Sequence, residues 1–439
     1  MRVLFVSNLY PPNVVGGYER LCFEVASAFV ERGHDVHVLA SDHGGGTAEY
    51  PGQTVRRRLR LLAGQEIYDP FSGDAAARDA VNRANLDALQ AALAEIKPDA
   101  VFAWNLFFLD RSFLAALERC GRPVSVMLTD NWLLSMERPE HLARFFREHV
   151  FGPAPFPLVP APTPASPPPP GLLRRLRMLV GGAAPAPVPA SEADDRPPPL
   201  RFPFGAVFGA AFVQELYADA GVSFARSRVV HNGVRQEARP DADFPDRTRL
   251  VREGELRLLF AGRLVDLKGA HDAVAALPLI DPAEAGVQSV RLTILGDARD
   301  AAYAERLRGE VAASGCADRI AFRPPVDEQA LFELFGRHDI YLFPSLYEPF
   351  SLTLIHALAC GIPTAASRAG GNVEIVRDGE GGVLFRKGDP ADLARVVLRL
   401  ARDPALRASI SAEGRAAASV FTFDAMVDGM EAFLLDGAA

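Results

Sequence analysis

Short apolar runs alternate with amphipathic stretches along this chain, and the alternation starts twice. The first series opens with an expected strand at 3–7, a helix from about 18 to 32 and a strand at 36–41. The second opens with a strand at 256–263 and a helix at 269–277. Alternation of this kind predicts parallel sheets covered by helices on both faces. We therefore expect an α/β protein with two doubly wound, Rossmann-like domains.

The same patterns predict the remaining elements of each half. The first half is expected to add strands at 99–104, 124–129 and 229–234 and a helix at about 78–96. The second is expected to add strands at 290–296, 319–323, 340–345 and 363–367 and helices at 301–314, 327–336, 372–377 and about 390–402. A chain of 439 residues is long enough for two separate cores.

Composition and charge exclude several classes of protein. A formal net charge of −8 argues against a nucleic-acid binder, which needs a basic surface. The four cysteines are far apart and form no C-x-x-C pair, which excludes a cysteine zinc site and a disulfide framework. The start MRVLFVSNLY does not fit a signal peptide, and no apolar run approaches the ~18 residues of a membrane span. We expect a cytoplasmic protein.

A proline-rich segment interrupts the first half. Sixteen of the 35 prolines lie between Pro153 and Pro199, which predicts an exposed insertion at 151–200. Within it, residues 172–180 place leucines on one helical face and arginines mostly opposite. This pattern is typical of a short interfacial helix. Two interpretations stay open, packing on its own domain or contact with a partner or the inner membrane surface.

The stretch SLYEPFSLTLIHALACGIP, residues 345–363, combines a loop, a carboxylate and a helix start. Ser351 is placed to cap the helix, and Gly361 ends it. Glu348 precedes the helix N-terminus, where free backbone N–H groups attract anions. A carboxylate beside an anion site suggests a sugar-phosphate ligand, and a solvated acid on an ordinary loop is the alternative.

A second motif, FAGRLVDLKG at 260–269, follows a strand and leads into a helix. Arg263 and Lys268 would place two cations beside that helix start. Two cations can offset the charge of a diphosphate, and of a diphosphate leaving group, without a metal ion.

Together these segments resemble the donor site of retaining glycosyltransferases with the two-domain GT-B fold, in the family often numbered four. The family phrases matched are E-P-F-G-x-x-x-x-E-A-x-A-x-G-x-P, G-R-x-x-x-x-K-G, P-x-x-G-G-x-E-R at 11–20 and G-G-x-x-E-I-V-x-D-G at 370–379. The resemblance covers nearly the whole chain except 151–200. The second Glu of the first phrase is absent, because position 356 is His.

The resemblance implies a domain plan and a reaction. Residues 1–235 would form the acceptor domain and 236–420 the donor domain, and a helix at 421–439 would cross back onto the first domain. The apolar positions of 420–436 follow helical spacing, as such a helix requires. The implied reaction moves a sugar from a UDP- or GDP-sugar to a carbohydrate, lipid-linked or small-molecule acceptor. It proceeds with retention of configuration and without a metal ion or other cofactor.

The resemblance also implies site residues. Glu348, Arg263 and Lys268 would carry catalysis. The donor-binding candidates are Gly16, Gly17, Gly296, Val326, Phe350, Ser351, Leu352, Thr353 and His356. The acceptor-side candidates are Asn105, Asp130 and Asn131, whose polar groups suit sugar hydroxyls. For the nearby aromatics Phe102, Trp104 and Trp132 we expect core packing, with stacking of Trp132 on a sugar as the alternative.

Position 356 is the main departure from the family pattern. In relatives the second Glu accepts hydrogen bonds from both ribose hydroxyls, whereas neutral His has one donor and one acceptor nitrogen. We therefore expect donor affinity to be lower by roughly ten- to a hundredfold. The sequence leaves two rival functions open. One is a GT-B subunit that binds a nucleotide sugar or glycan without catalysis, and the other is a nucleotide-sugar epimerase or phosphorylase.

Overall fold

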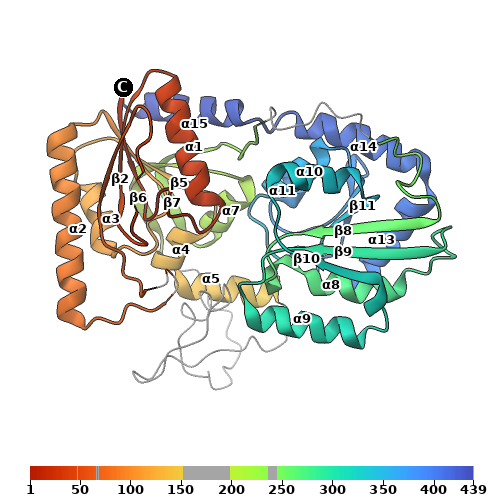
Figure 1. Cartoon of the computed structure of the whole chain (residues 1–439). Helices are drawn as coiled ribbons and strands as arrows, with labels where there is room; N and C mark the ends of the chain where they lie inside the picture. Colours follow the sequence, from red (N-terminus) through yellow and green to blue (C-terminus); the bar gives the residue numbers. More distant parts are fainter. Residues whose placement is uncertain (47, 66, 68, 152–197, 236–244, 439) are drawn as a thin grey trace.

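The chain folds into two α/β domains joined by short crossings, as Figure 1 shows for the computed structural model. The structure describes residues 1–439 except 47, 66, 68, 152–197, 236–244 and 439. Each domain is built on a seven-stranded sheet in which all strand pairs are parallel. The predicted fold class, two Rossmann-like doubly wound domains, is confirmed. The helix predicted at 172–180 and most of the proline-rich insertion lie outside the described residues.

The first domain has the strand order β3-β2-β1-β4-β5-β6-β7. Its elements are β1 (Arg2–Val6), α1 (Gly17–Glu31), β2 (Asp35–Ser41), β3 (Gln53–Leu59), α2 (Ala75–Ile96), β4 (Ala100–Ala103), α3 (Arg111–Glu118), β5 (Val124–Leu128), α4 (Trp132–Glu137), α5 (Pro139–Phe145), η1 (Phe146–Val150), β6 (Leu200–Phe208), α7 (Ala211–Asp219) and β7 (Val222–Val229). The central strands β1, β4 and β5 are almost entirely buried, as expected of parallel strands covered on both faces.

The second domain has the order β10-β9-β8-β11-β12-β14-β13. Its elements are β8 (Glu255–Ala261), η2 (Asp266–Lys268), α8 (Ala270–Ala276), η3 (Leu277–Leu279), β9 (Ser289–Leu295), α9 (Ala301–Ala313), η4 (Ala317–Arg319), β10 (Ile320–Arg323), α10 (Glu328–Gly336), β11 (Ile340–Phe343), α11 (Leu352–Ala359), β12 (Thr364–Ser367), α12 (Asn372–Ile375), β13 (Arg377–Asp378), β14 (Gly381–Phe385), α13 (Pro390–Arg402) and α14 (Pro404–Ala418).

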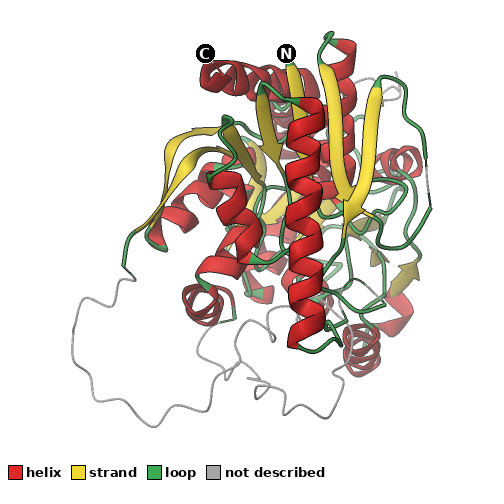
Figure 2. Ribbon diagram, turned by 90° about the vertical axis from the view of Figure 1, so that its left-hand side faces the viewer, coloured by secondary structure: helices red, strands yellow, loops and turns green. Residues whose placement is uncertain are grey.

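The last helix, α15 (Phe423–Ala438), leaves the second domain and lies against the first. Its apolar residues Phe423, Met426, Val427, Met430, Phe433 and Leu434 share a buried cluster with residues of β1, β2 and α1. At the surface, Glu431 accepts hydrogen bonds from Arg32 at 2.5 Å and His34 at 2.6 Å. The two ends of the chain consequently lie close together in Figure 2.

One strand was placed wrongly from sequence. The strand predicted at 229–234 is β7 at Val222–Val229, and the chain leaves the sheet where the prediction began. The sequence VSFARSRV carries charged and polar residues that face solvent, so it lacks the continuous apolar run of the central strands. Val234 instead forms an isolated parallel bridge with Thr422, where the chain crosses back toward the first domain.

Candidate active site

A cavity of about 740 Å³ lies between the two domains. The first domain lines it with Leu9, Val14–Leu21, Ile67, Asn105, Phe107, Phe108, Thr129, Asp130, Asn131, Trp132, Ser135, Phe146 and Asn232. The second domain lines it with Arg263, Leu267, Lys268, Arg299 and the loop from Tyr347 to Thr353. Most of these residues follow the carboxyl ends of strands, which is where ligands bind in parallel α/β sheets. The sequence therefore places chemically active residues at the facing edges of both sheets.

Lys268 and Glu348 are 80 residues apart and form an ion pair in this cavity. The backbone joins them, because Leu346 N–H donates to the Leu267 carbonyl at 2.8 Å. Gly269 makes this approach possible: its φ is +67°, and a Cβ there would lie 2.0 Å from the Pro344 carbonyl oxygen. The glycine of the G-R-x-x-x-x-K-G phrase thus sets the position of the lysine.

Glu348 is only 5% exposed, and its backbone packs against two glycines. Gly371 N–H donates to the Glu348 carbonyl at 2.8 Å. A Cβ on Gly370 would lie 2.2 Å from that same carbonyl oxygen, and one on Gly371 would lie 2.1 Å from the Pro349 carbonyl oxygen. The Gly-Gly pair at 370–371 therefore lets the two loops pack closely, and a larger residue at either position would displace the backbone that carries Glu348.

Helix α11 begins directly beyond this loop. Ser351 Oγ accepts a hydrogen bond from Leu354 N–H at 3.1 Å, so the predicted N-cap is confirmed. Ser351, Leu352 and Thr353 all line the cavity, as does Phe350. The N-terminal end of this helix consequently faces the space beside Lys268 and Glu348, a favourable environment for an anion.

The acceptor-side candidates lie on the opposite wall. Asn105 Oδ1 accepts from Phe107 N–H at 3.0 Å, and Asp130 Oδ1 accepts from Trp132 N–H at 2.9 Å. Asn131 precedes α4 and lines the cavity with these two residues. Phe102 and Trp104 are buried in the core. Trp132 is also buried, its indole N–H donating to Met127 O at 3.2 Å, and it borders the cavity.

Of the donor-binding candidates, Gly16 and Gly17 line the cavity, but Gly296, Val326 and His356 are not among the residues lining it. Gly296 has a packing role, because a Cβ there would lie 2.0 Å from the Gly262 carbonyl oxygen. Val326 is 40% exposed on the loop before α10. His356 lies one helical turn beyond Thr353.

The His356 ring lies between α10 and α11. Its Nε2 is 3.7 Å from Glu328 Oε1, and its ring centroid is 5.1 Å from that of Phe332. Because residues three apart share a helix face, His356 continues the face that Thr353 presents to the cavity.

Two buried polar residues of the cavity were missed from sequence. Asn232 follows β7, and its Oδ1 has no hydrogen-bond partner among the described residues. Tyr347 is 7% exposed, and its hydroxyl likewise has no partner in the described part of the chain. The available signals were slight: Tyr347 directly precedes Glu348, and Asn232 lies in a turn after a strand.

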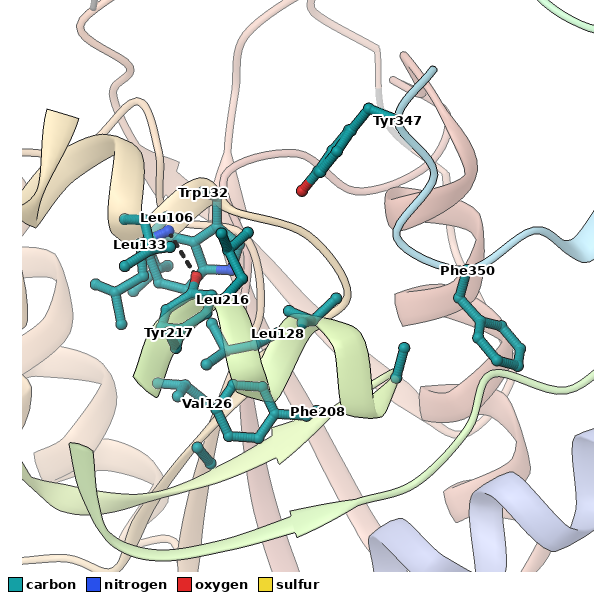
Figure 3. Close-up of a cluster of buried hydrophobic side chains, with 14 of the residues drawn as sticks. Leu106, Val126, Leu128, Trp132, Leu133, Phe208, Leu216, Tyr217, Tyr347 and Phe350 are labelled. Carbon is teal, nitrogen blue, oxygen red and sulfur yellow. Dashed lines mark hydrogen bonds between the residues drawn. The ribbon is translucent and has the colours of Figure 1, made fainter. Parts of the chain in front are cut away.

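Tyr347 crosses the boundary between the domains. Its ring centroid lies 4.8 Å from that of Phe146 and 5.8 Å from that of Phe212, both in the first domain. Figure 3 shows its hydroxyl extending from the second-domain loop toward the side chains around Trp132. Burial and the charges of Asp130 and Glu348 raise the pKa of Tyr347 far above its ordinary value, so the phenol stays protonated and able to donate.

Glu374, in α12, links the domains by hydrogen bonds. Its carboxylate accepts from the backbone N–H groups of Ala211 and Phe212, each at 2.8 Å, and pairs with His231 Nε2 at 2.8 Å. Ala211 and Phe212 open α7, whose N-cap residue, Ala210, has no polar side chain. A glutamate of the second domain therefore caps a helix of the first.

The described residues contain no group of three His, Cys, Asp or Glu side chains arranged to hold a metal ion. None of the described helices is both long and apolar enough to cross a membrane.

Comparison with known families adds to this geometry. Residues 243–417 match the profile described as "Glycosyl transferases group 1", and residues 15–150 match "Glycosyltransferase Family 4". A D-inositol 3-phosphate glycosyltransferase of Acidothermus cellulolyticus is 38% identical over 176 residues, which cover 39% of this chain and 39% of that protein. The chain thus aligns with about two fifths of that relative's length. A glycogen synthase of Mycobacterium tuberculosis is 28% identical over 426 residues, covering 92% of this chain and 87% of that one.

Solved structures share the whole architecture. Sucrose-phosphate synthase from Thermosynechococcus elongatus superposes with a TM-score of 0.67 at 20% identity, covering 98% of each chain. Anabaena Alr3699/HepE, solved in complex with UDP-glucose, gives 0.65 at 19% identity and covers 99% of this chain and 100% of that one. These neighbours have the GT-B fold, which confirms the predicted architecture.

Proposed function

We propose that this chain, which carries a glycosyl transferases group 1 domain and a family 4 domain, is a glycosyltransferase. Its donor is a nucleotide-diphosphate sugar bound by the second domain, and its acceptor hydroxyl approaches from the first. The observation that carries the proposal is the pairing of Lys268 with Glu348 in the interdomain cavity, beside Arg263 and the start of α11. Cations, a buried carboxylate and free helix N–H groups are what a sugar diphosphate needs.

The leaving group is the nucleoside diphosphate. Arg263, Lys268 and the backbone N–H groups near 351–353 stabilise the negative charge that grows on it, so the proposed reaction requires no metal ion. Lys268 already contacts Glu348, and it would then lie between that carboxylate and the incoming phosphate. Attraction to the two negative groups would hold the amine in place between them.

Glu348 acts on the sugar. Its carboxylate accepts hydrogen bonds from donor-sugar hydroxyls and favours the positive charge that develops at the anomeric carbon. The leaving phosphate oxygen takes the acceptor proton on the same face, and this gives retention of configuration. Closure of the two domains excludes water and aligns the substrates.

UDP- or GDP-sugars are the proposed donors, and the complex of Alr3699/HepE with UDP-glucose supports the first of these. The proposed acceptor is a carbohydrate, a lipid-linked molecule or a small molecule, in the cytoplasm or at its membrane face. The interaction proposed for 172–180 remains a prediction.

The test is a donor panel. Purified protein is incubated with UDP- and GDP-sugars and an acceptor mixture, and the released nucleoside diphosphate is measured. Arg263→Ala and Lys268→Ala are expected to abolish release while the fold survives. Arg337→Ala is the matched control, since its pair with Glu333 is an exposed i,i+4 contact of little energetic weight.

The outcomes separate the alternatives. Near-wild-type release by either cavity variant would refute the assigned site. Tight nucleotide binding without release would favour a binding subunit. A changed sugar that is still attached to its nucleotide would favour an epimerase.

A further inference from the structure

The charges lining the cavity are divided unevenly between the domains. Among the described lining residues, the second domain supplies the cations Arg263, Lys268 and Arg299. The first domain supplies one cation, Arg20, and two acids, Glu19 and Asp130. The acceptor wall therefore carries more negative than positive charge in the part of the chain that the structure describes.

Arg20 is exposed and lies near two acids, Glu24 and Glu328. Burial raises the pKa of Glu24 and of Glu328, and the neighbouring Arg20 guanidinium partly lowers each. A phosphate group on an acceptor would need cations with free N–H donors in a fork or cluster, and it would be repelled by a nearby carboxylate. Among its described residues, the first-domain wall has the repelling group, Asp130, and a single cation, Arg20.

The same wall suits hydroxyl groups. Tyr347 brings a buried phenol that has no protein partner among the described residues, and both Asp130 and Glu348 lie near enough to raise its pKa. A buried hydroxyl without a partner costs stability unless a ligand supplies the missing hydrogen bond. Tyr347 therefore marks a place between the donor carboxylate and the acceptor wall where a ligand hydroxyl fits.

The wall also carries aromatic side chains. Phe107, Phe108, Phe146 and Trp132 border the cavity next to Asn105 and Asp130. Sugar rings present C–H faces to aromatic side chains while their hydroxyls bond to polar groups at the edges. A phosphate group placed against these rings would lose its hydration, and the rings offer no hydrogen bonds to replace it, so its binding would cost free energy.

We propose that the acceptor subsite takes a neutral, polyhydroxylated ligand, a sugar unit without a phosphate group. The Tyr347 hydroxyl is a positioning group that bonds to one of its hydroxyls, together with the Asp130 carboxylate. This inference rests on the proposed function and makes it more specific. It also separates this chain from relatives whose names specify a phosphorylated acceptor.

The first experiment compares matched ligands. Glucose with glucose 6-phosphate, and myo-inositol with inositol 3-phosphate, are offered to the protein–UDP complex, and binding is read by saturation-transfer NMR. This measurement requires no turnover. The neutral member of each pair is expected to give the stronger signal, and where transfer occurs the higher kcat/KM by at least about tenfold. Stronger binding or faster transfer of the phosphorylated members would overturn the inference.

The second experiment tests Tyr347. Tyr347→Phe is expected to raise the acceptor KM or Kd roughly three- to tenfold, the effect of one neutral hydrogen bond, and to leave UDP affinity unchanged. Its urea midpoint is expected to equal or exceed that of wild type, because the hydroxyl has no protein partner to lose. An unchanged acceptor constant would refute the role of Tyr347.

Tyr341→Phe is the matched control. Its hydroxyl is buried in the same domain and donates to Ala261 O at 3.1 Å, and Tyr341 does not line the cavity. This variant is expected to lose stability and keep the acceptor constant. If no nucleotide sugar is turned over, the proposed function fails, and the NMR comparison still decides the ligand class.

Discussion

Replacing Glu374 by alanine tests how the two domains are held around the cavity. The carboxylate caps α7 across the domain boundary through two backbone N–H groups and also pairs with His231, all at 2.8 Å. It is largely buried, with 15% of its side chain exposed. Glu374→Ala would leave the first two N–H groups of α7 without this acceptor.

The magnitude follows from these contacts. A hydrogen bond to a charged group contributes about 1.5–3 kcal/mol, and loss of a helix N-cap costs about 0.5–2 kcal/mol. Water can reach part of the freed site, so the sum is discounted. We expect a loss of about 2–3 kcal/mol, equivalent to roughly 30- to 150-fold in the opening equilibrium of the α7 end. Glu374→Gln keeps one acceptor oxygen without the charge, and we expect about half that loss.

Hydrogen–deuterium exchange of peptides covering 209–219 measures the opening directly. Faster exchange in Glu374→Ala is expected there, while the core of the second domain stays protected. Glu380→Ala is the control, because Glu380 is 67% exposed and its ion pair with Arg377 spans 3.8 Å. Unchanged exchange at 209–219 in Glu374→Ala would refute the assignment of Glu374 as an interdomain cap.

The effect of Glu374 should depend on pH. Burial favours the neutral carboxyl, but the hydrogen bonds from His231 and the two backbone amides outweigh it and lower the pKa of Glu374. The stabilisation is therefore complete above the unfolded-state pKa, near 4.3, and is lost as the pH falls through the lower folded-state pKa. The difference between wild type and Glu374→Ala is expected to persist at neutral pH and to shrink as the pH falls below about 4.3 and through the lower folded-state pKa.

Two further substitutions test the donor side. Gly371→Ala places a Cβ about 2.1 Å from the Pro349 carbonyl oxygen, so we expect a loss of about 1–3 kcal/mol in stability and a marked fall in kcat. Gly309→Ala, with no atom within 4 Å of the added Cβ, should show neither in urea unfolding or in assays. His356→Glu is expected to raise UDP affinity roughly ten- to a hundredfold in calorimetry. It is best measured with Glu328→Gln, since Glu328 lies 3.7 Å away, and unchanged affinity would place the ribose contact elsewhere.

Sequence patterns were sufficient for the architecture because parallel strands buried on both faces read as continuous apolar runs. Such runs identified β1, β4, β5 and most strands of the second domain. They did not identify β3, whose sequence QTVRRRL carries three consecutive arginines at the edge of its sheet. They also missed α14, because α13 and α14 follow each other with only Asp403 between them.

The meeting of Lys268 and Glu348 was predictable for a different reason. Lys268 and Glu348 belong to local phrases whose glycines and helix starts can be read in sequence, and the parallel sheet brings the phrases together. Tyr347 and Glu374 could not be assigned in this way. Their roles depend on atoms of the other domain, and the packing of one domain on the other leaves no periodic signal in either sequence segment.

The contacts between the domains differ in kind at α15 and at the cavity, and this difference affects how the domains can move. The first domain and α15 share an extensive apolar cluster. Where the chain crosses back, Gly233 packs directly against Thr422, because a Cβ on Gly233 would lie 2.0 Å from the Thr422 carbonyl oxygen. Around the cavity the described contacts between the domains include the Glu374 cap, the Lys387 hydrogen bond to the His149 carbonyl, the stacking of His231 on Phe350 and the rings that surround Tyr347. Separating polar and aromatic contacts of this kind costs less than exposing the face of α15. We therefore expect the domains to open at the cavity while α15 stays docked, so that substrate entry and product release require breaking the Glu374 and Tyr347 contacts.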